Sequence, residues 1–110
     1  MWRQFQTLYN VDENIIKVIE SEFNFDKITK VQNVVIPEFL KNKDVIVKSC
    51  TGSGKTLAYL IPLFQKLITY SKESPIKNRI LSVIMLPSRE LSIQVFNVFL
   101  KFVEIGRAHV

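Results

Sequence analysis

The residues best suited to chemistry form a short segment of small side chains that ends in Lys55 and Thr56. Its glycines permit left-handed backbone angles, so that successive N–H groups can turn inward around an anion. A helix that starts there would add its positive end. Lys55 could then reach the β- and γ-phosphates of a nucleotide, and Thr56 could place its hydroxyl on a bridging Mg2+ ion. We therefore expect a phosphate-binding loop made of Ser49, Thr51, Gly52, Ser53, Gly54, Lys55 and Thr56.

One residue of this loop departs from the general phosphate-loop pattern, which has glycine where this chain has Ser49. Serine is still small, as the tight turn requires. Cys50 beside it is the only cysteine, so no internal disulfide can form. With no histidine nearby, a small filler explains Cys50 better than a nucleophile does. The simpler alternative for the whole segment is a flexible surface turn before a helix.

The elements around the loop indicate how it is positioned. Residues 45–47 are a short β-branched run bounded by polar residues, which is typical of a buried parallel strand. Apolar residues then recur at helical spacing over 57–68, although Pro62 should kink or shorten that helix. We expect a second strand at 80–86 and a final helix from 88 onward. This order predicts an α/β fold with a parallel sheet, whose ligands bind beyond the carboxyl ends of the strands.

Two further helices are expected before the loop. After Asp12, apolar residues at helical spacing predict a helix over about 13–22. Thr29 can cap a second helix, which should stop around Asn42 before a charged turn.

Composition limits the class of protein. The chain has 110 residues, which allows one domain, and its 47% apolar and 23% charged residues are typical of a folded globular protein. No apolar run is long enough for a membrane helix, and the first residues lack a secretory signal pattern, so we expect an intracellular protein without a membrane partner. The net charge of +5 suits a polyanionic partner, although a solvated lysine face is the commoner cause of such scattered charge.

Three segments, in this order, resemble the motifs of the DEAD-box ATP-dependent RNA helicases. Residues 25–32 resemble the family's Q motif, with Phe5 as its isolated upstream aromatic. The phosphate loop follows, with Ser49 where the family usually has alanine, and residues 87–94 resemble the RNA-contacting motif Ia. The resemblance extends from the upstream aromatic to about Val103. It implies an incomplete RecA-like P-loop NTPase domain with a parallel sheet.

The resemblance implies that Gln32 recognises adenine, with Phe25 beside it and Phe5 stacked on the base. A carboxamide can accept from the adenine amino group and donate to its ring nitrogen at once, whereas guanine presents the reverse pattern. The site should therefore prefer ATP to GTP. Phe5 and the tryptophan three residues earlier leave an alternative open, because either aromatic could simply cover the core. Two residues depart from the family motif: Asn24 replaces Gly and Lys30 replaces Pro.

The motif Ia resemblance implies an RNA contact at Pro87, Ser88, Arg89 and Glu90. The simpler alternative is an ordinary helix start, with Ser88 as the cap and Glu90 favoured by the helix dipole. An RNA contact is compatible with such a helix start. Backbone N–H groups and Arg89 could bind a phosphate, which fixes position without reading sequence.

The implied cofactors are ATP and Mg2+, with Lys55 and Thr56 as catalytic residues and Thr56 as the metal ligand. Hydrolysis also needs the family's Asp-Glu-Ala-Asp and Ser-Ala-Thr motifs and a second lobe, none of which follows Gln94. We therefore expect this stretch alone to be inactive and, with open strand edges, to be poorly stable or to aggregate.

A longer parent would hydrolyse ATP and unwind or remodel RNA. The resemblance weakly suggests that this activity serves ribosome assembly. We expect the parent to be a monomer whose partners are RNA and pre-ribosomal or other ribonucleoproteins, in the nucleus or nucleolus of a eukaryote and in the cytoplasm otherwise.

These expectations divide the chain into a Q-motif region at 1–32, a partial ATP-binding domain at 33–103 and a tail at 104–110. The tail is identified as the translation of a common sequencing adapter, and the alternative is a helix closed by Gly106. Two other functions stay open: a P-loop ATPase or kinase that does not act on RNA, and a non-catalytic module that uses the fold for protein contacts.

Overall fold

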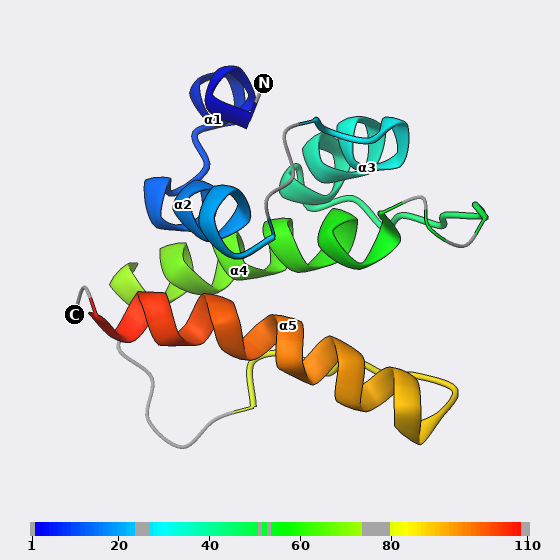
Figure 1. Cartoon of the computed structure of the whole chain (residues 1–110). Helices are drawn as coiled ribbons and strands as arrows, with labels where there is room; N and C mark the ends of the chain where they lie inside the picture. Colours follow the sequence, from blue (N-terminus) through cyan, green and yellow to red (C-terminus); the bar gives the residue numbers. More distant parts are fainter. Residues whose placement is uncertain (1, 24–26, 51, 53, 74–79, 109–110) are drawn as a thin grey trace.

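The computed structural model describes residues 2–23, 27–50, 52, 54–73 and 80–108. Within these ranges the chain forms α1 (Trp2–Tyr9), α2 (Glu13–Glu22), α3 (Lys30–Leu40), α4 (Lys55–Glu73) and α5 (Arg89–Ala108). Helix α4 runs through the middle and contacts α2, α3 and α5 (Figure 1). Helix α2 also packs against α1 and α5, so the five helices surround one core.

The two helices predicted before the loop are confirmed, and local hydrogen bonds explain their first residues. The Asp12 carboxylate accepts from the N–H of Asn14 at 2.8 Å and caps α2. Thr29 caps α3, because its hydroxyl accepts from the N–H of Gln32 at 3.2 Å. The Gln32 side-chain oxygen in turn accepts from the Thr29 N–H at 3.0 Å, and these two hydrogen bonds form a capping box.

Helix α1 was not predicted. No capping residue precedes it in the sequence. Its aromatic residues were interpreted as a base-stacking contact or as cover for the core, and not as a helix. The rings of Trp2 and Phe5 meet edge to face at 5.8 Å between centroids, and the rings of Phe5 and Tyr9 lie 4.7 Å apart. Burial of Trp2 and Phe5 holds so short a helix in place, because a helix of this length is marginal by itself.

Pro62 does not shorten α4, contrary to one of the two effects expected of it. The helix continues through Pro62 to Glu73, although proline removes one backbone hydrogen bond. Leu60, Ile61 and Phe64 are buried on the same stretch. Their burial offsets the missing hydrogen bond, since each large apolar side chain contributes about 1.5–3 kcal/mol.

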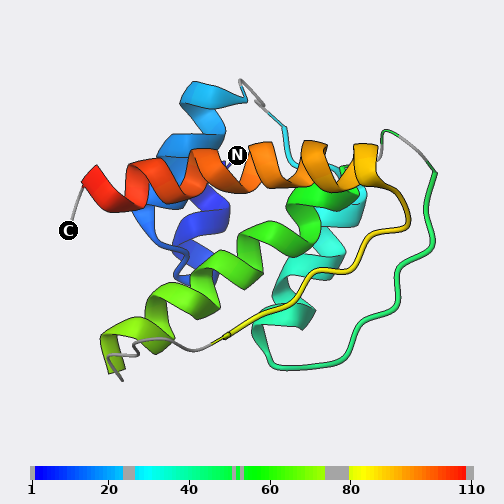
Figure 2. The ribbon, with the colours of Figure 1, turned by 90° about the horizontal axis from the view of Figure 1, so that it is seen from below.

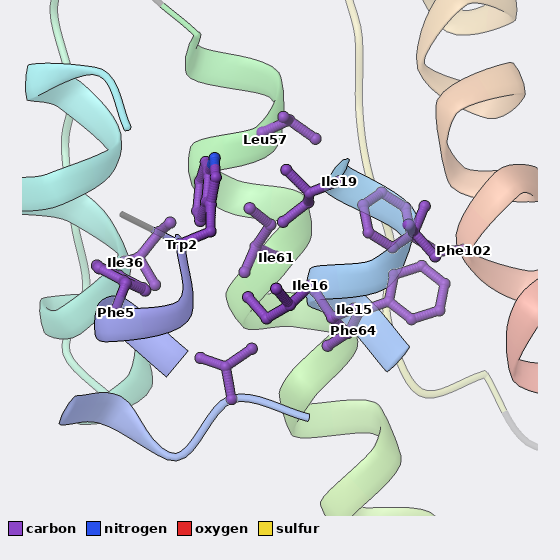
Figure 3. Packing of buried hydrophobic residues seen from close by; sticks show 12 residues of the cluster. Trp2, Phe5, Ile15, Ile16, Ile19, Ile36, Leu57, Ile61, Phe64 and Phe102 are labelled. Carbon is purple, nitrogen blue, oxygen red and sulfur yellow. The ribbon is translucent and has the colours of Figure 1, made fainter. Parts of the chain in front are cut away.

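The core lies between α1, α2 and α4, with single residues from α3 and α5 at its edges (Figure 3). Helix α2 supplies the largest share of it, and Ile16 and Ile19 are among its fully buried side chains. At the α5 end, the rings of Phe64 and Phe102 lie 5.2 Å apart. The buried cluster comprises Trp2, Phe5, Val11, Ile15, Ile16, Val18, Ile19, Ile36, Leu57, Ile61, Phe64 and Phe102.

The substitution Ile16→Ala should lower the free energy of unfolding by about 2–5 kcal/mol, because it leaves a cavity in this core. Leu8 on α1 offers a control, since its side chain is 75% exposed. Leu8→Ala should change stability by less than about 0.5 kcal/mol. Urea unfolding of the full-length protein measures both. Equal effects of the two substitutions would show that the helices do not pack as described.

The predicted parallel sheet is not formed by the residues that the structure describes, and this part of the fold prediction is corrected. Residues 45–47 and 80–86 lack strand pairing. Figure 2 shows them as separate extended connections, the first in an open loop beside α3 and the second running past α4. A strand is stabilised by pairing with neighbouring strands and by covered faces, so an apolar run alone does not produce one.

The side chains of segment 80–86 nevertheless point alternately to two sides, as they do in a strand. Ser82, Ile84 and Leu86 line a cavity of about 280 Å³ together with residues of α4 and α5. Met85, between two of them, is 89% exposed. The segment therefore presents one apolar side to the helices and the other to solvent.

The last helix begins where the sequence predicts but runs further than expected. Its capping hydrogen bond joins the Leu91 N–H to the Ser88 hydroxyl at 3.2 Å. The helix extends through Gly106 to Ala108, so Gly106 does not close it. None of the described helices is both long and apolar enough to cross a membrane.

Candidate nucleotide-binding site

The phosphate loop connects the extended segment after α3 to the first residue of α4. Gly52 and Gly54 have positive φ angles of 83° and 86°, a conformation that other residue types rarely adopt. Lys55 is the first residue of α4, as the phosphate-loop pattern requires. The left-handed glycines and the helix start therefore occur where the sequence predicted them.

Lys55 reaches back across the loop. Its Nζ donates to the carbonyl oxygen of Ser49 at 2.7 Å, which places the ammonium group at the mouth of the loop. Lys55 is exposed, so this contact is open to solvent. A phosphate that entered the loop would meet this ammonium group and could replace the carbonyl oxygen as its partner.

Gln32 is the buried polar side chain among the described residues, with 2% of its surface exposed. Its Nε2 donates to the carbonyl oxygen of Gly54 at 3.2 Å, while its Oε1 accepts from Thr29. The start of α3 is thus tied to the end of the phosphate loop across 22 residues of sequence. The sequence predicted both parts of the site, and the direct hydrogen bond between them is an addition.

Gly54 lies against this pair. A Cβ atom at Gly54 would come within 2.6 Å of Gln32 Nε2 and within 3.0 Å of two Thr29 side-chain atoms. At Gly52 the space for a Cβ atom is open within 4 Å. Close backbone approach and positive φ therefore both demand glycine at 54, whereas only φ demands it at 52.

Thr56 and Tyr59 follow on the first turns of α4. Burial raises the pKa of the Tyr59 hydroxyl above its ordinary value. Tyr59 thus keeps its proton at neutral pH.

The donor set suits Mg2+ with a nucleotide rather than a metal held by protein alone. Among the described residues, no group of three or more His, Cys, Asp or Glu side chains could hold a metal ion. Mg2+ commonly keeps several waters and binds through one or two protein oxygens plus substrate phosphates. The Thr56 hydroxyl, directly after Lys55, can act as such an oxygen ligand.

The structure places Phe5 in the core, which is the alternative role that the sequence left open. Its side chain is 3% exposed and lies between Trp2 and Tyr9. Phe5 has little exposed surface in this arrangement, and its expected stacking on a base stays a prediction. A phenylalanine at a helical spacing suits a core and a base platform equally well, and the sequence could not separate them.

The residues of the motif Ia resemblance form an exposed corner at the start of α5. Pro87, Ser88, Arg89 and Glu90 are all exposed. Ser88 caps the helix as predicted, and its carbonyl oxygen accepts from the Ser92 hydroxyl at 2.9 Å. The helix start and the Arg89 guanidinium are accessible to a phosphate group.

Several predicted site residues lie outside the described residues. These are Phe25 of the Q motif and Thr51 and Ser53 of the phosphate loop.

Comparisons with known proteins agree with these observations. The family described as "DEAD/DEAH box helicase" matches residues 29–110. The chain is 46% identical over 86 residues to ATP-dependent rRNA helicase SPB4 of Yarrowia lipolytica, covering 77% of this chain and 14% of that protein. It is 40% identical over 106 residues to the protein of the same name from Gibberella zeae, covering 96% of this chain and 16% of that protein. The chain thus spans about a seventh of the length of these curated relatives.

A solved structure has a similar fold. The RNA helicase Prp28 from Chaetomium thermophilum, bound to ADP, matches with a TM-score of 0.75 and 30% sequence identity. The match covers 88% of this chain and 23% of that one. The arrangement of the helices is therefore similar to part of a DEAD-box helicase domain. Because the family match covers most of the sequence, the chain belongs to the DEAD/DEAH box helicase family.

Proposed function

We propose that the chain carries the ATP-binding start of an ATP-dependent RNA helicase. The observation that supports this most is the hydrogen bond between Gln32 and the Gly54 carbonyl, directly before Lys55 and Thr56. It brings an amide suited to a nucleobase and a loop suited to phosphates into one site. A P-loop without such a neighbour would support nucleotide binding but no choice of base.

The remaining hydrogen-bonding capacity of Gln32 matches adenine. An amide oxygen accepts two hydrogen bonds and an amide nitrogen donates two. Thr29 and Gly54 use one of each, so one acceptor site and one N–H group remain. Adenine offers an amino donor and a ring-nitrogen acceptor to this pair. Because Gln32 is buried, base binding requires a local movement that uncovers it.

The phosphates would lie in the loop itself. Its N–H groups and the start of α4 favour negative charge, and Lys55 would move from the Ser49 carbonyl oxygen to the β- and γ-phosphates. Bound Mg2+ would neutralise charge that develops on the phosphates during transfer. Thr56 would hold that ion through its hydroxyl and, with Lys55, forms the catalytic pair within this chain.

RNA would contact the exposed corner at Pro87, Ser88, Arg89 and Glu90. Exposed N–H groups at a helix start, with an adjacent guanidinium, suit a phosphate of the backbone and carry no sequence preference. Two relatives are named rRNA helicases, which supports ribosomal RNA as the substrate. We therefore place the full-length protein in ribosome assembly, among pre-ribosomal partners and in the nucleolus of a eukaryote.

RNA-stimulated ATP hydrolysis by the full-length protein tests this function. The proposal expects slow hydrolysis alone and faster hydrolysis when RNA is added. Equal rates with and without RNA would favour a P-loop ATPase that does not act on RNA. If no nucleotide binds, a non-catalytic interaction module becomes the better explanation.

Replacing Gln32 by alanine should remove the preference for ATP over GTP. A paired amide contact to a base contributes about 1–3 kcal/mol of discrimination, so the ratio of the two affinities should fall about tenfold. Competition binding with the two nucleotides on the full-length protein measures this ratio.

Thr29→Ala is the matched control, because it breaks the same capping box and keeps the Gln32 side chain. It should cost about 1 kcal/mol of stability and leave the ATP preference intact. An unchanged preference in Gln32→Ala would remove Gln32 from base recognition.

A further inference from the structure

A cavity of about 270 Å³ lies between α3, α4 and residues 45–47, and the proposed function does not use it. The wall residues on α3 are four positions apart, and those on α4 lie three and four positions after Lys55, so each set shares one side of its helix. Val45 and Val47 also line the cavity, while Ile46 between them is 99% exposed. The wall residues are Val31, Val35, Phe39, Val45, Val47, Lys55, Ala58 and Tyr59.

The walls of this cavity combine apolar side chains with positive charge. Most of the wall residues are valine, alanine or phenylalanine, whose side chains form no hydrogen bonds. Lys55 is the charged residue among them, and its ammonium group donates to a neutral partner, the carbonyl oxygen of Ser49. The ammonium group of Lys66 lies 4.7 Å from the ring centroid of Phe39, another wall residue. No acidic side chain belongs to the described wall, so the charge of Lys55 suits an anion.

The cavity beside residues 80–86 separates the effect of charge from the effect of size. It has a volume of about 280 Å³, and its walls are also mainly apolar. Its polar wall residues are Ser82 and Ser92, and no charged side chain lines it among the described residues. A neutral apolar ligand would fit either cavity, whereas an anionic one would favour the cavity beside Lys55.

The volume suits a ligand with a single aromatic ring. An apolar cavity of about 150 Å³ is enough to hold benzene. The cavity beside Lys55 therefore has room for a ring and a short alkyl chain. Burial of the ring and the chain would supply most of the affinity, and a carboxylate at the end of the chain would bind the ammonium group.

We propose that this cavity binds a small aromatic carboxylate, whose apolar body fills the space between α3 and α4 and whose carboxylate pairs with Lys55. Lys55 is also the residue that would bind the β- and γ-phosphates, so such a ligand competes with ATP. The competition rests on the proposed function, whereas binding in the cavity does not.

The test uses two probes that differ only in charge, the carboxylate 4-phenylbutyrate and the alcohol 4-phenylbutan-1-ol. Ligand-observed NMR titration of the full-length protein without nucleotide should show saturable binding of the carboxylate. The alcohol should bind about three- to tenfold more weakly, because it lacks one charge-assisted contact at an exposed lysine. Lys55→Met keeps the apolar stem of the side chain. It should weaken the carboxylate by the same factor and leave the alcohol unchanged.

Two substitutions on α3 locate the site. Val31→Phe adds bulk to the cavity wall and should weaken binding of both probes at least about fivefold. Val34→Phe is the matched control, since Val34 is 59% exposed and does not line the cavity. It should change neither affinity. Urea unfolding of both full-length variants checks that they remain folded.

Competition with ATP completes the test. The carboxylate should raise the apparent dissociation constant of ATP, and the alcohol should raise it less. The inference is overturned if neither probe binds, which is the result expected when another part of the longer protein fills the cavity. It is also overturned if Lys55→Met leaves the affinity for the carboxylate unchanged, or if Val34→Phe weakens binding as much as Val31→Phe. If the carboxylate binds as described and the protein binds no ATP, the proposed function is overturned and the cavity assignment stands.

Discussion

Lys55→Ala in the full-length protein should lower ATP hydrolysis by at least about 100-fold, the usual loss when one preorganised donor to a transition state is removed. In the structure the Lys55 ammonium group lies at the mouth of the loop, 2.7 Å from the Ser49 carbonyl oxygen. Alanine cannot reach the β- and γ-phosphates, so the charge that develops there would lack this partner. Steady-state ATPase assays with saturating RNA measure the loss.

The control is Lys17→Ala, which removes an exposed lysine of α2. It lowers the net charge by the same amount, so a general electrostatic effect on RNA or ATP would appear in both variants. We expect its hydrolysis rate to stay within about twofold of the unaltered protein. A Lys55→Ala variant with normal RNA-stimulated hydrolysis would show that this loop is not the catalytic phosphate site.

Gly54→Ala should disrupt the site more than any other single methyl addition in the loop. The new Cβ would lie 2.6 Å from Gln32 Nε2, and the backbone would have to keep a φ of 86°. The strained backbone costs about 1–2 kcal/mol, and the overpacking adds about 1–3 kcal/mol. The loop can relieve this only by moving away from Gln32, which breaks the hydrogen bond to the Gly54 carbonyl oxygen.

Gly52→Ala provides a matched comparison, because Gly52 has nearly the same φ but open space around it. It should cost only the backbone strain, about 1–2 kcal/mol. Urea unfolding and ATP titration of the two full-length variants measure the difference. If both variants lose the same stability and the same affinity, the close packing of Gly54 against Gln32 and Thr29 is wrong.

The helices and their caps could be predicted because their signals are local. Asp12, Thr29 and Ser88 each precede an apolar periodic stretch, and each caps the helix that follows. The left-handed glycines of the loop were also predictable, since a phosphate loop before a helix requires them. For α1 no such cap precedes the helix, and its formation depends on burial of aromatic residues against distant elements.

The predicted strands depend on partners that the local sequence does not contain. Residues 45–47 and 80–86 have the composition of strands, yet neither is paired within the described part of the chain. Strand pairing is a long-range property, so composition shows only that a segment is suited to it. Family resemblance predicts a sheet, and these two segments keep the exposed apolar side chains that a sheet would cover.

The candidate site, like the fold, was predictable only in part. Lys55 and Thr56 were identified by residue type and spacing, and Gln32 by the resemblance to the Q motif. The structure brings Gln32 to the end of the loop. The position of Phe5 was not predictable, because a buried aromatic and a base-stacking aromatic look alike in sequence. The Gln32 contact with Gly54 needed the fold, since it joins distant segments.

Direct titration of the full-length protein with ATP and with GTP, both in Mg2+, tests the central claim that this site binds an adenine nucleotide. The account predicts saturable binding of ATP and weaker binding of GTP, because Gln32 matches only the adenine edge. Failure to bind ATP, or equal affinity for the two nucleotides, would contradict it.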